Sequence, residues 1–293
     1  MKRMFITYIL LSVSIYGFSA QKTINNTYDK HYGWIALHGG FYSHSENYED
    51  ISTIGGGVIS FGFGYEFRHN GFFASIGGDI ELIWSNAITT TYKYDQLMYD
   101  TQGKKINYHF DIAESSEQIY ATNISVPILL GYYNTGFYMG IGAKVGYCIS
   151  AKGKTFRHYT TYATYPQYFE DFEQMPNHFY KTYTAKNIEN IKMNIPINII
   201  AEVGYDVLYN ANYNLYGKDQ ILKIGLYAEY GLRNAFNNKI DAPLFSVNQE
   251  HPTQLNVYSY YNNKAITNKI LPFNIGLKVT YMLQIPTKNC HCK

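Results

Sequence analysis

The chain has 293 residues, a mean hydropathy of −0.26 and a formal net charge of +2 at pH 7. Mildly negative hydropathy argues against a helical membrane protein, and so small a net charge gives a nucleic-acid partner no electrostatic support. Aromatic residues make up 17% of the chain and include 32 tyrosines. Tyrosine favours both β-strands and membrane–water interfaces.

The N-terminus is typical of a secretory signal peptide, which we assign to residues 1–20. Lys2 and Arg3 precede an apolar run, FITYILLSVSIYGF, that ends in small residues before Gln21. The first cysteine is Cys148, so a lipoprotein is not expected. Past residue 20 no apolar run is long enough for a spanning helix. These features leave a soluble secreted protein or an outer-membrane barrel.

Residues 58–84, VISFGFGYEFRHNGFFASIGGDIELIW, indicate a hairpin of two strands around the turn RHNG. Alternate side chains form one face of aromatic and branched residues and one face of Gly, Ser and isolated charges. A solvated strand face is usually built from Thr, Lys, Glu and Arg, because glycine weakens strands. We therefore expect the glycine-rich face to line a crowded barrel interior, where small residues make room for charged ones. The aromatic face would then contact lipid.

The same alternation predicts eight strands, each of about the ten residues that a tilted strand needs to cross a bilayer. Their ranges are 34–42, 58–67, 72–84, 120–132, 137–149, 191–205, 222–232 and 271–281. Short turns at 68–71 and 134–136 and a modest one at 206–221 alternate with long polar connections at 43–57, 85–118, 150–190 and 233–270. This asymmetry favours periplasmic turns and extracellular loops. The predicted fold class is all-β: an eight-stranded antiparallel up-and-down transmembrane β-barrel with long extracellular loops and both termini in the periplasm.

The expected domain organisation follows from these ranges. It comprises a signal peptide at 1–20, a periplasmic N-terminal segment at 21–33, the outer-membrane β-barrel at 34–283 and a periplasmic C-terminal tail at 284–293.

Aromatic residues at the ends of the lipid-facing rows predict two girdles at headgroup level. The girdle at the short-turn ends consists of Tyr65, Phe67, Phe72, Tyr132, Phe137, Tyr205 and Tyr281. The girdle at the long-loop ends consists of Phe41, Trp84, Tyr120 and Tyr147. A soluble barrel has no reason to place aromatic residues in this way.

Three downward strands share an aliphatic–Pro–aliphatic opening, in SVPILLGYY, NIPINIIAEVGY and LPFNIGLKVTY. Because proline cannot donate to a ladder, Pro127, Pro196 and Pro272 should mark bulges or local pairing gaps. With the signal peptide ending in SAQK and the strand GFYMGIGAKVGYCIS, these segments resemble the PorT-like outer-membrane β-barrel family of Gram-negative Bacteroidota. The last strand, NIGLKVTY, is similar to the assembly signal of such barrels, although MLQIPTKNCHCK follows its final aromatic. The resemblance implies a fold, an outer-membrane location and a link to envelope or secretion complexes.

Charged residues in the inward phase predict a salt-bridged interior, because a buried ion without a partner costs several kcal/mol. The acids are Glu66, Asp79, Glu81, Glu202, Asp206 and Glu229, and the bases are Arg68, Lys144, Lys192, Lys223, Arg233 and Lys278. The two sets are equal in size, so the interior could be charge-compensated. The alternative, a small-solute channel, fits poorly because eight strands enclose little more than side chains.

Signals for chemistry are weak, and we expect no catalytic residue, cofactor or metal. A barrel enzyme acting on envelope lipid would need a nucleophile near a rim histidine, for which the candidates are His38, Ser43, His44, Ser45, His158 and His178. Cys290, His291 and Cys292 could ligate zinc, but no second cluster completes the site. A periplasmic disulfide or a flexible tail is the favoured explanation for them.

The long connections are dense in tyrosine, in YKYDQLMYD, FRHYTTYATYPQYFEDF and LNVYSYYNN. Tyrosine is favoured at recognition surfaces, although a folded cap over the barrel explains it as well. The expected function is therefore non-catalytic: surface contact, or membership of an envelope or secretion complex. The expected partners are outer-membrane lipid and envelope proteins, with no nucleic acid. The alternatives are a barrel enzyme that modifies envelope lipid and a soluble, secreted, calycin-like binding barrel.

Overall fold

The computed structural model describes residues 29–45, 51–89, 91–99, 102–165, 178–209, 220–237, 245–248, 251, 253–262 and 270–285. The predicted signal peptide and the Cys290–His291–Cys292 tail lie outside these residues. Within them, no helix has the length and apolarity to cross a membrane.

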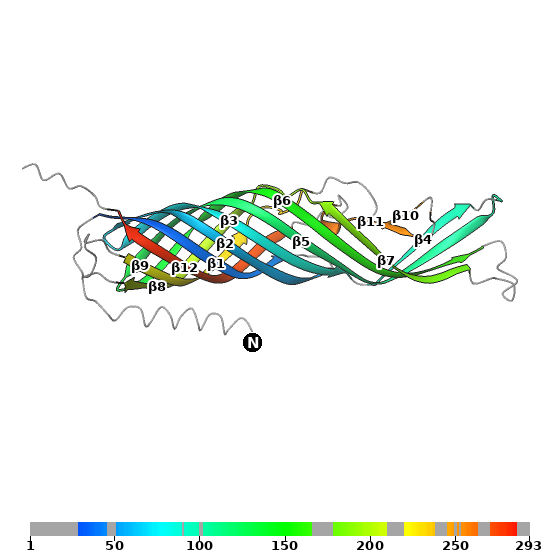
Figure 1. The fold of residues 1–293 in the computed structure, drawn as a ribbon, viewed down its shortest axis with the longest axis horizontal. Coiled ribbons are helices and arrows are strands. Elements are labelled where there is room, and N and C mark those ends of the chain that lie inside the picture. The colour runs from blue at the N-terminus through cyan, green and yellow to red at the C-terminus, as the bar shows by residue number, and fades with distance from the viewer. Residues whose placement is uncertain are drawn as a thin grey trace, which may run out of the picture.

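Eight strands pair side by side in an antiparallel ring, which confirms the predicted fold class. They are β1 (Lys30–Ser45), β2 (Ile51–His69), β3 (Phe72–Thr89), β5 (Lys105–Asn134), β6 (Phe137–Thr164), β8 (Ile197–Tyr209), β9 (Gln220–Gly231) and β12 (Leu271–Gln284). Each pairs with the next, and the pairing of β12 with β1 completes the ring. The start of β1 and the end of β12 lie together at one end of the barrel (Figure 1).

Several strands are much longer than the predicted ten residues. β5 has 30 residues and β6 has 28, and they stay paired from Asn134↔Phe137 to Asn107↔Thr164. β4 (Tyr92–Tyr99) adds to β5, and β7 (His178–Asn190) adds to β6. The prediction of polar loops at 85–118 and 150–190 is therefore wrong, since much of both segments forms a sheet that continues beyond the ring (Figure 1). We call this sheet of β4, β5, β6 and β7 the extension.

Other predicted boundaries also differ from the structure. β2 begins at Ile51 instead of 58 and β1 ends at Ser45 instead of 42, so most of the predicted loop at 43–57 is strand. β1 begins at Lys30, ahead of the predicted 34, and β8 begins at Ile197 instead of 191. Residues 191–196 run as irregular chain with an isolated bridge between Met193 and Phe236. The connection after β9 contains the hairpin β10 (Phe245–Val247) and β11 (Leu255–Val257) and the short 3-10 helix η2 (Tyr260–Asn262).

The three prolines lie at interruptions of pairing, as predicted. Pro127 pairs with Lys144 on β6. On its other side, the pairing between β3 and β5 is interrupted between Ile76↔Ile128 and Asp79↔Ser125, and the register stays the same. Pro196 immediately precedes β8. Pro272 lies one residue beyond the last β12–β9 pair, Phe273↔Tyr230.

The aromatic face of residues 58–84 points outward and the Gly/Ser/acid face points inward. Phe61 and Phe63 are more than half exposed, whereas Ser60 and Asp79 are buried. The outward rows of the other strands are equally apolar, with Ile128, Leu130, Ile141, Leu226 and Leu277 all exposed. We call this exposed surface around the ring the apolar belt.

All the predicted girdle residues are exposed or half-buried on the outward side. The second girdle does not lie at the ends of the strands as predicted, because β3, β5 and β6 continue beyond Trp84, Tyr120 and Tyr147. Trp84 pairs with Tyr120, which lies about a dozen residues along β5 from Tyr132. At about 3.3 Å per residue and a tilt of roughly 40°, that separation spans about 30 Å, the thickness of a bilayer core.

Beyond Tyr120 and Ile149 the outward side chains become polar. On β5 they are Gln118 and Ser116. On β6 they are Lys152, Lys154, His158 and Thr160, with Phe156 as the one apolar side chain among them. The strands continue without a break across this change. The extension therefore has a polar outer face, whereas the ring has an apolar one.

Candidate functional site

The interior of the ring holds two groups of ion pairs, and the first lies near the short turns. Arg68 Nε lies 2.7 Å from Glu66 Oε1, and Arg68 Nη1 lies 2.7 Å from Asp206 Oδ2. Lys223 Nζ lies 3.0 Å from the other oxygen of Glu66. All four residues are buried, so each charge has its partner within hydrogen-bonding distance where water does not reach it.

The second group lies nearer the middle of the ring and is centred on Lys144. Its Nζ contacts Glu81, lies 2.6 Å from Glu229 Oε1 and lies 4.0 Å from Asp79 Oδ2. Lys144 is only 2% exposed. A second ammonium, that of Lys278, pairs with Glu202 on β8.

The structure thus pairs ten of the twelve charged residues that were predicted to face inward. Two of the expected bases do not take part. Lys192 and Arg233 are exposed, because β8 begins after the first and β9 ends before the second. The expected equality of charge therefore does not hold for the described interior, which has six carboxylates against four basic side chains.

Inward glycines make room mainly for aromatic rings. A Cβ on Gly64 or Gly77 would lie 2.4 Å from the Trp34 indole, and one on Gly131 would lie 2.4 Å from Phe73. Tyr138 covers its glycines in the same way. For these three rings, the contacts in which a Cβ would lie under 3.0 Å from the ring are Trp34 over Gly64 and Gly77, Phe73 over Gly131 and Gly140, and Tyr138 over Gly204 and Gly225. Each ring thus rests on the next two strands, and the prediction that glycines serve charged residues applies chiefly to Gly62, which faces Asp79.

The far end of the ring interior is closed by an apolar group that we call the mouth cluster. It includes Tyr42, Ile83, Phe236, Tyr261 and Ile270, all buried. The segment before β8 and the segment after β9 supply part of it, held by backbone bonds such as Asn194 N–H to Ala235 O at 2.9 Å. Beneath it, a cavity of about 30 Å³ adjoins Glu81 and Glu229, which is room for one or two water molecules. The described interior is thus filled, as the salt-bridged reading expects.

The inner face of the extension has its own core, which sequence reasoning missed. Phe110, Ile112 and Tyr159 are buried against the β10–β11 hairpin, together with Phe245 and Leu255. The Tyr159 hydroxyl accepts a hydrogen bond from the Leu255 N–H at 3.0 Å. The extension is therefore a packed structure and not a pair of loops.

A buried carboxylate, Glu117, fastens η2 to the extension. It accepts hydrogen bonds from the Ser259 hydroxyl and, at 3.0 Å, from the Tyr260 N–H. Burial raises the pKa of Glu117 to about 7, with Glu189 acting in the same sense, whereas the Ser259 bond and the charge of Arg157 lower it. Glu117 lies beyond Tyr120, outside the apolar belt.

We expect this contact to weaken as pH rises. A folded-state pKa above the usual 4.5 means that the stabilisation is complete below about pH 4.5 and is lost as pH rises through about 7. Hydrogen exchange at the Ser259 and Tyr260 amides, corrected for the intrinsic rate, should show opening that increases by about two orders of magnitude over that window. Glu117→Gln should flatten the dependence. Equal pH dependence in the variant would show that another group titrates.

The proposed rim histidines do not form a catalytic arrangement in the described residues. His44 is buried, with its ring 3.2 Å from the Tyr42 hydroxyl and 3.5 Å from Ser85 Oγ. His158 is exposed and contacts Thr184 Oγ1 at 2.9 Å. Among the side chains that the structure describes, neither contacts a carboxylate. Ser43 is half-buried beside His44 in sequence, and the side chains of Ser45 and His178 lie outside the described residues.

His38 lies within the ring and not at its rim. It is 4% exposed, and its ring packs edge-on against Tyr227 with centroids 5.0 Å apart. Alternation along β1 would have placed it inside, because Ile35 and Leu37 form the outward row and His38 follows Ala36 on the other face. Cys148 is half-buried and packs against the mouth cluster.

Comparison with known proteins gives no family. No family model and no curated protein matches the chain. Among solved structures, the chain is similar to the crystal structure of Ail, the attachment invasion locus protein of Yersinia pestis, in complex with the heparin analogue sucrose octasulfate. The identity is 8% and the TM-score is 0.26, over 86% of this chain and 99% of that chain. At this similarity the fold is read from the strand pairings themselves.

Proposed function

We propose that the chain is a non-catalytic outer-membrane β-barrel protein that presents a strand-built contact surface outside the cell. One observation carries the proposal: the outward side chains of β5 and β6 change from apolar to polar while the strands continue unbroken. A sheet that leaves a bilayer and keeps its own core would show this change.

The apolar belt supports a membrane location over a soluble barrel. Leu130, Ile141 and Leu277 are each more than 60% exposed, and their neighbours in the same rows are also apolar. An apolar surface encircling a monomer is far larger than water-soluble proteins expose. The packed interior argues equally against a channel, since ion pairs, rings and the mouth cluster occupy it.

The polar outer face carries a basic patch next to the belt. Lys154 Nζ lies 4.8 Å and Lys186 Nζ 5.5 Å from the centre of the Phe156 ring, and Lys152 is exposed nearby. Basic side chains at this height can bind anionic headgroups or an acidic partner. The resemblance to the PorT-like family supports the second use, in an envelope or secretion complex.

Cysteine labelling tests the location and the orientation. In a chain whose Cys148, Cys290 and Cys292 are serines, a membrane-impermeant maleimide is applied to intact cells carrying one introduced cysteine. His158→Cys on the extension should react at once. Asn134→Cys at a short turn should react only after the outer membrane is permeabilised, and Leu130→Cys in the belt only after denaturation. Reaction of Asn134→Cys but not His158→Cys would reverse the orientation, and equal reaction of all three would contradict a membrane barrel.

The belt predicts a large effect of charge. Ile141→Arg should lower the unfolding free energy in lipid vesicles by about 2–4 kcal/mol, because an arginine near the bilayer midplane is poorly solvated. Thr160→Arg, on the same strand but beyond the belt, should change it by less than about 0.5 kcal/mol. Similar values for the two variants would remove the argument for a belt.

Native mass tests the complex. Gently extracted protein should migrate well above a single detergent-bound chain of 33.8 kDa, together with its partner. Lys154→Glu combined with Lys186→Glu should release the partner if the basic patch binds it. Migration of the unaltered protein as a single chain would contradict the complex and leave surface contact alone.

A further inference from the structure

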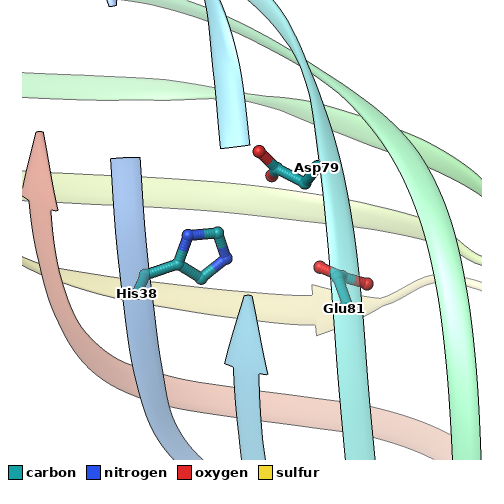
Figure 2. Close-up of side chains that lie close together, drawn as sticks. All are labelled: His38, Asp79 and Glu81. Carbon is teal, nitrogen blue, oxygen red and sulfur yellow. The ribbon is translucent and has the colours of Figure 1, made fainter. Parts of the chain in front are cut away.

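We propose that the ring interior binds one divalent transition-metal cation, of the Zn²⁺ class, through His38, Asp79 and Glu81. Strand register brings these residues together. His38 on β1 pairs with Ser60 on β2, and Ser60 pairs with Glu81 on β3. Asp79 lies on the same inward face of β3, two residues away. Figure 2 shows the imidazole extending from β1 toward the two carboxylates on β3.

The distances suit shared coordination. One ring nitrogen of His38 and one oxygen from each carboxylate all lie within 4.8 Å of one another, and all three residues are buried. Atoms bound to a common ion at about 2.0–2.2 Å must be roughly 3–4 Å apart, so a small movement of the side chains closes the site. Imidazole with carboxylates is a ligand set for Zn²⁺ and similar ions, whereas Ca²⁺ and Mg²⁺ prefer oxygen alone.

Unpartnered polar atoms point to a missing ligand. Both ring nitrogens of His38 are buried and have no hydrogen-bond partner among the described residues, and neither has the Ser60 hydroxyl beside it. A buried imidazole normally donates through one nitrogen and accepts or coordinates through the other. His38 does neither, although it is 96% enclosed and directed at two carboxylates.

The glycine at position 62 gives this arrangement its room. A Cβ there would lie 2.0 Å from Asp79 Oδ1, so only glycine on β2 lets that carboxylate lie across toward β1. Gly62 pairs with Asp79 in the ladder, just as Ser60 pairs with Glu81. Two small residues on β2 thus separate the imidazole from the carboxylates.

Charge supports the same conclusion. The six carboxylates of the described interior exceed its four basic side chains by two negative charges. One divalent cation would supply the difference. Lys144 does not exclude it, although its ammonium contacts Glu81 and must leave that carboxylate when the cation binds. The ammonium can stay on Glu229, 2.6 Å away, while the cation takes Glu81 and Asp79.

The test measures metal in the full chain, purified without a metal-binding tag, stripped with a chelator and dialysed against Zn²⁺. One zinc per folded chain should remain, by elemental analysis. His38→Gln and Asp79→Asn should each weaken zinc binding at least about 100-fold, more than the loss of an outer partner of a ligand. Asp79 suits the test because its nearest cation is 4.0 Å away. Heat-modifiable gel migration checks that each variant folds.

Two controls separate this site from others. His44→Gln removes a second buried inward histidine of β1, whose ring nitrogens have partners, and should leave zinc affinity within about twofold. Cys290→Ser combined with Cys292→Ser removes the thiols of the tail and should also leave one zinc per chain. Zinc that disappears with the tail thiols would overturn the proposal. The proposal would also be overturned if the wild-type chain, after stripping and dialysis against Zn²⁺, retained no zinc. That result would mean that water fills the site.

A spectroscopic measurement keeps the inference testable if the ligand variants do not fold. X-ray absorption of the zinc-loaded wild-type chain should show nitrogen and oxygen neighbours, including one imidazole, and no sulfur. Sulfur in that shell, or the absence of imidazole scattering, would overturn the assignment.

Discussion

Lys144→Ala is expected to unfold the barrel rather than open it, lowering the unfolding free energy by about 3–5 kcal/mol. Lys144 is the cation nearest to Glu81, Glu229 and Asp79, and its removal leaves these buried carboxylates without their ammonium. Their repulsion acts where water cannot screen it. The measurement is the unfolding midpoint of chelator-treated protein in detergent, followed by heat-modifiable migration.

A double variant distinguishes electrostatics from loss of packing. Glu229→Gln in the Lys144→Ala background removes one of the unpaired charges and should recover part of the lost stability, giving a coupling energy of at least about 1 kcal/mol. Lys93→Ala is the matched control, because its pair with Asp111 is long, at 3.8 Å, and exposed. That variant should change little. A Lys144→Ala barrel that is as stable as wild type, or that conducts solutes, would contradict the salt-bridged interior.

Trp34→Ala should cost about 3–5 kcal/mol, the usual effect of deleting a large buried ring. The indole lies over Gly64 and Gly77, and its Nε1–H donates to Ser75 Oγ at 3.1 Å. Alanine would leave a void bounded by two residues that have no side chains to move into it. The unfolding free energy in detergent measures the loss.

Gly77→Leu separates the effect of the ring from that of the strand. In the wild-type barrel its Cβ would lie 2.4 Å from the indole and 2.6 Å from Phe63 O, so the substitution should destabilise by about 1–3 kcal/mol. In the Trp34→Ala barrel the contact with the indole is gone and the contact with Phe63 O remains, so the same leucine should destabilise less than in the wild-type barrel. Equal destabilisation in both backgrounds would show that the strand itself, and not the ring, requires glycine at this position.

The ring was predictable because each of its strands obeys a period of two. Ile59, Phe61 and Phe63 alternate with Ser60, Gly62 and Gly64, and this contrast identifies both the strand and its faces. The ion pairs were predictable in part, because the same alternation shows which charged side chains of a strand face the interior. Lys192 and Arg233 were wrongly predicted to face inward, because the alternation of faces was continued beyond the ends of β8 and β9.

The extension was not predictable by the same means, since its strands change phase. The register between β5 and β6 shifts between Ile112 and Glu114 and again between Thr122 and Asn123. Each bulge moves an extra residue into one strand and reverses which parity points inward. The outward residues there are also polar, so the contrast between faces weakens just where the phase is lost. His38, with ligands on a strand forty residues away, belongs to no local spacing pattern.

The three rings on their glycines also set how the strands can slide. Trp34, Phe73 and Tyr138 each engage the two strands that follow, always in the same direction around the barrel. Moving β2 by two residues would bring Glu66 or Gly62 beneath Trp34 in place of Gly64, and moving β3 would bring Ser75 or Asp79. The stagger between neighbouring strands sets the shear of a barrel, and shear and diameter are linked. Three interior side chains therefore help to determine the shear of the whole barrel, together with the hydrogen bonds between the strands.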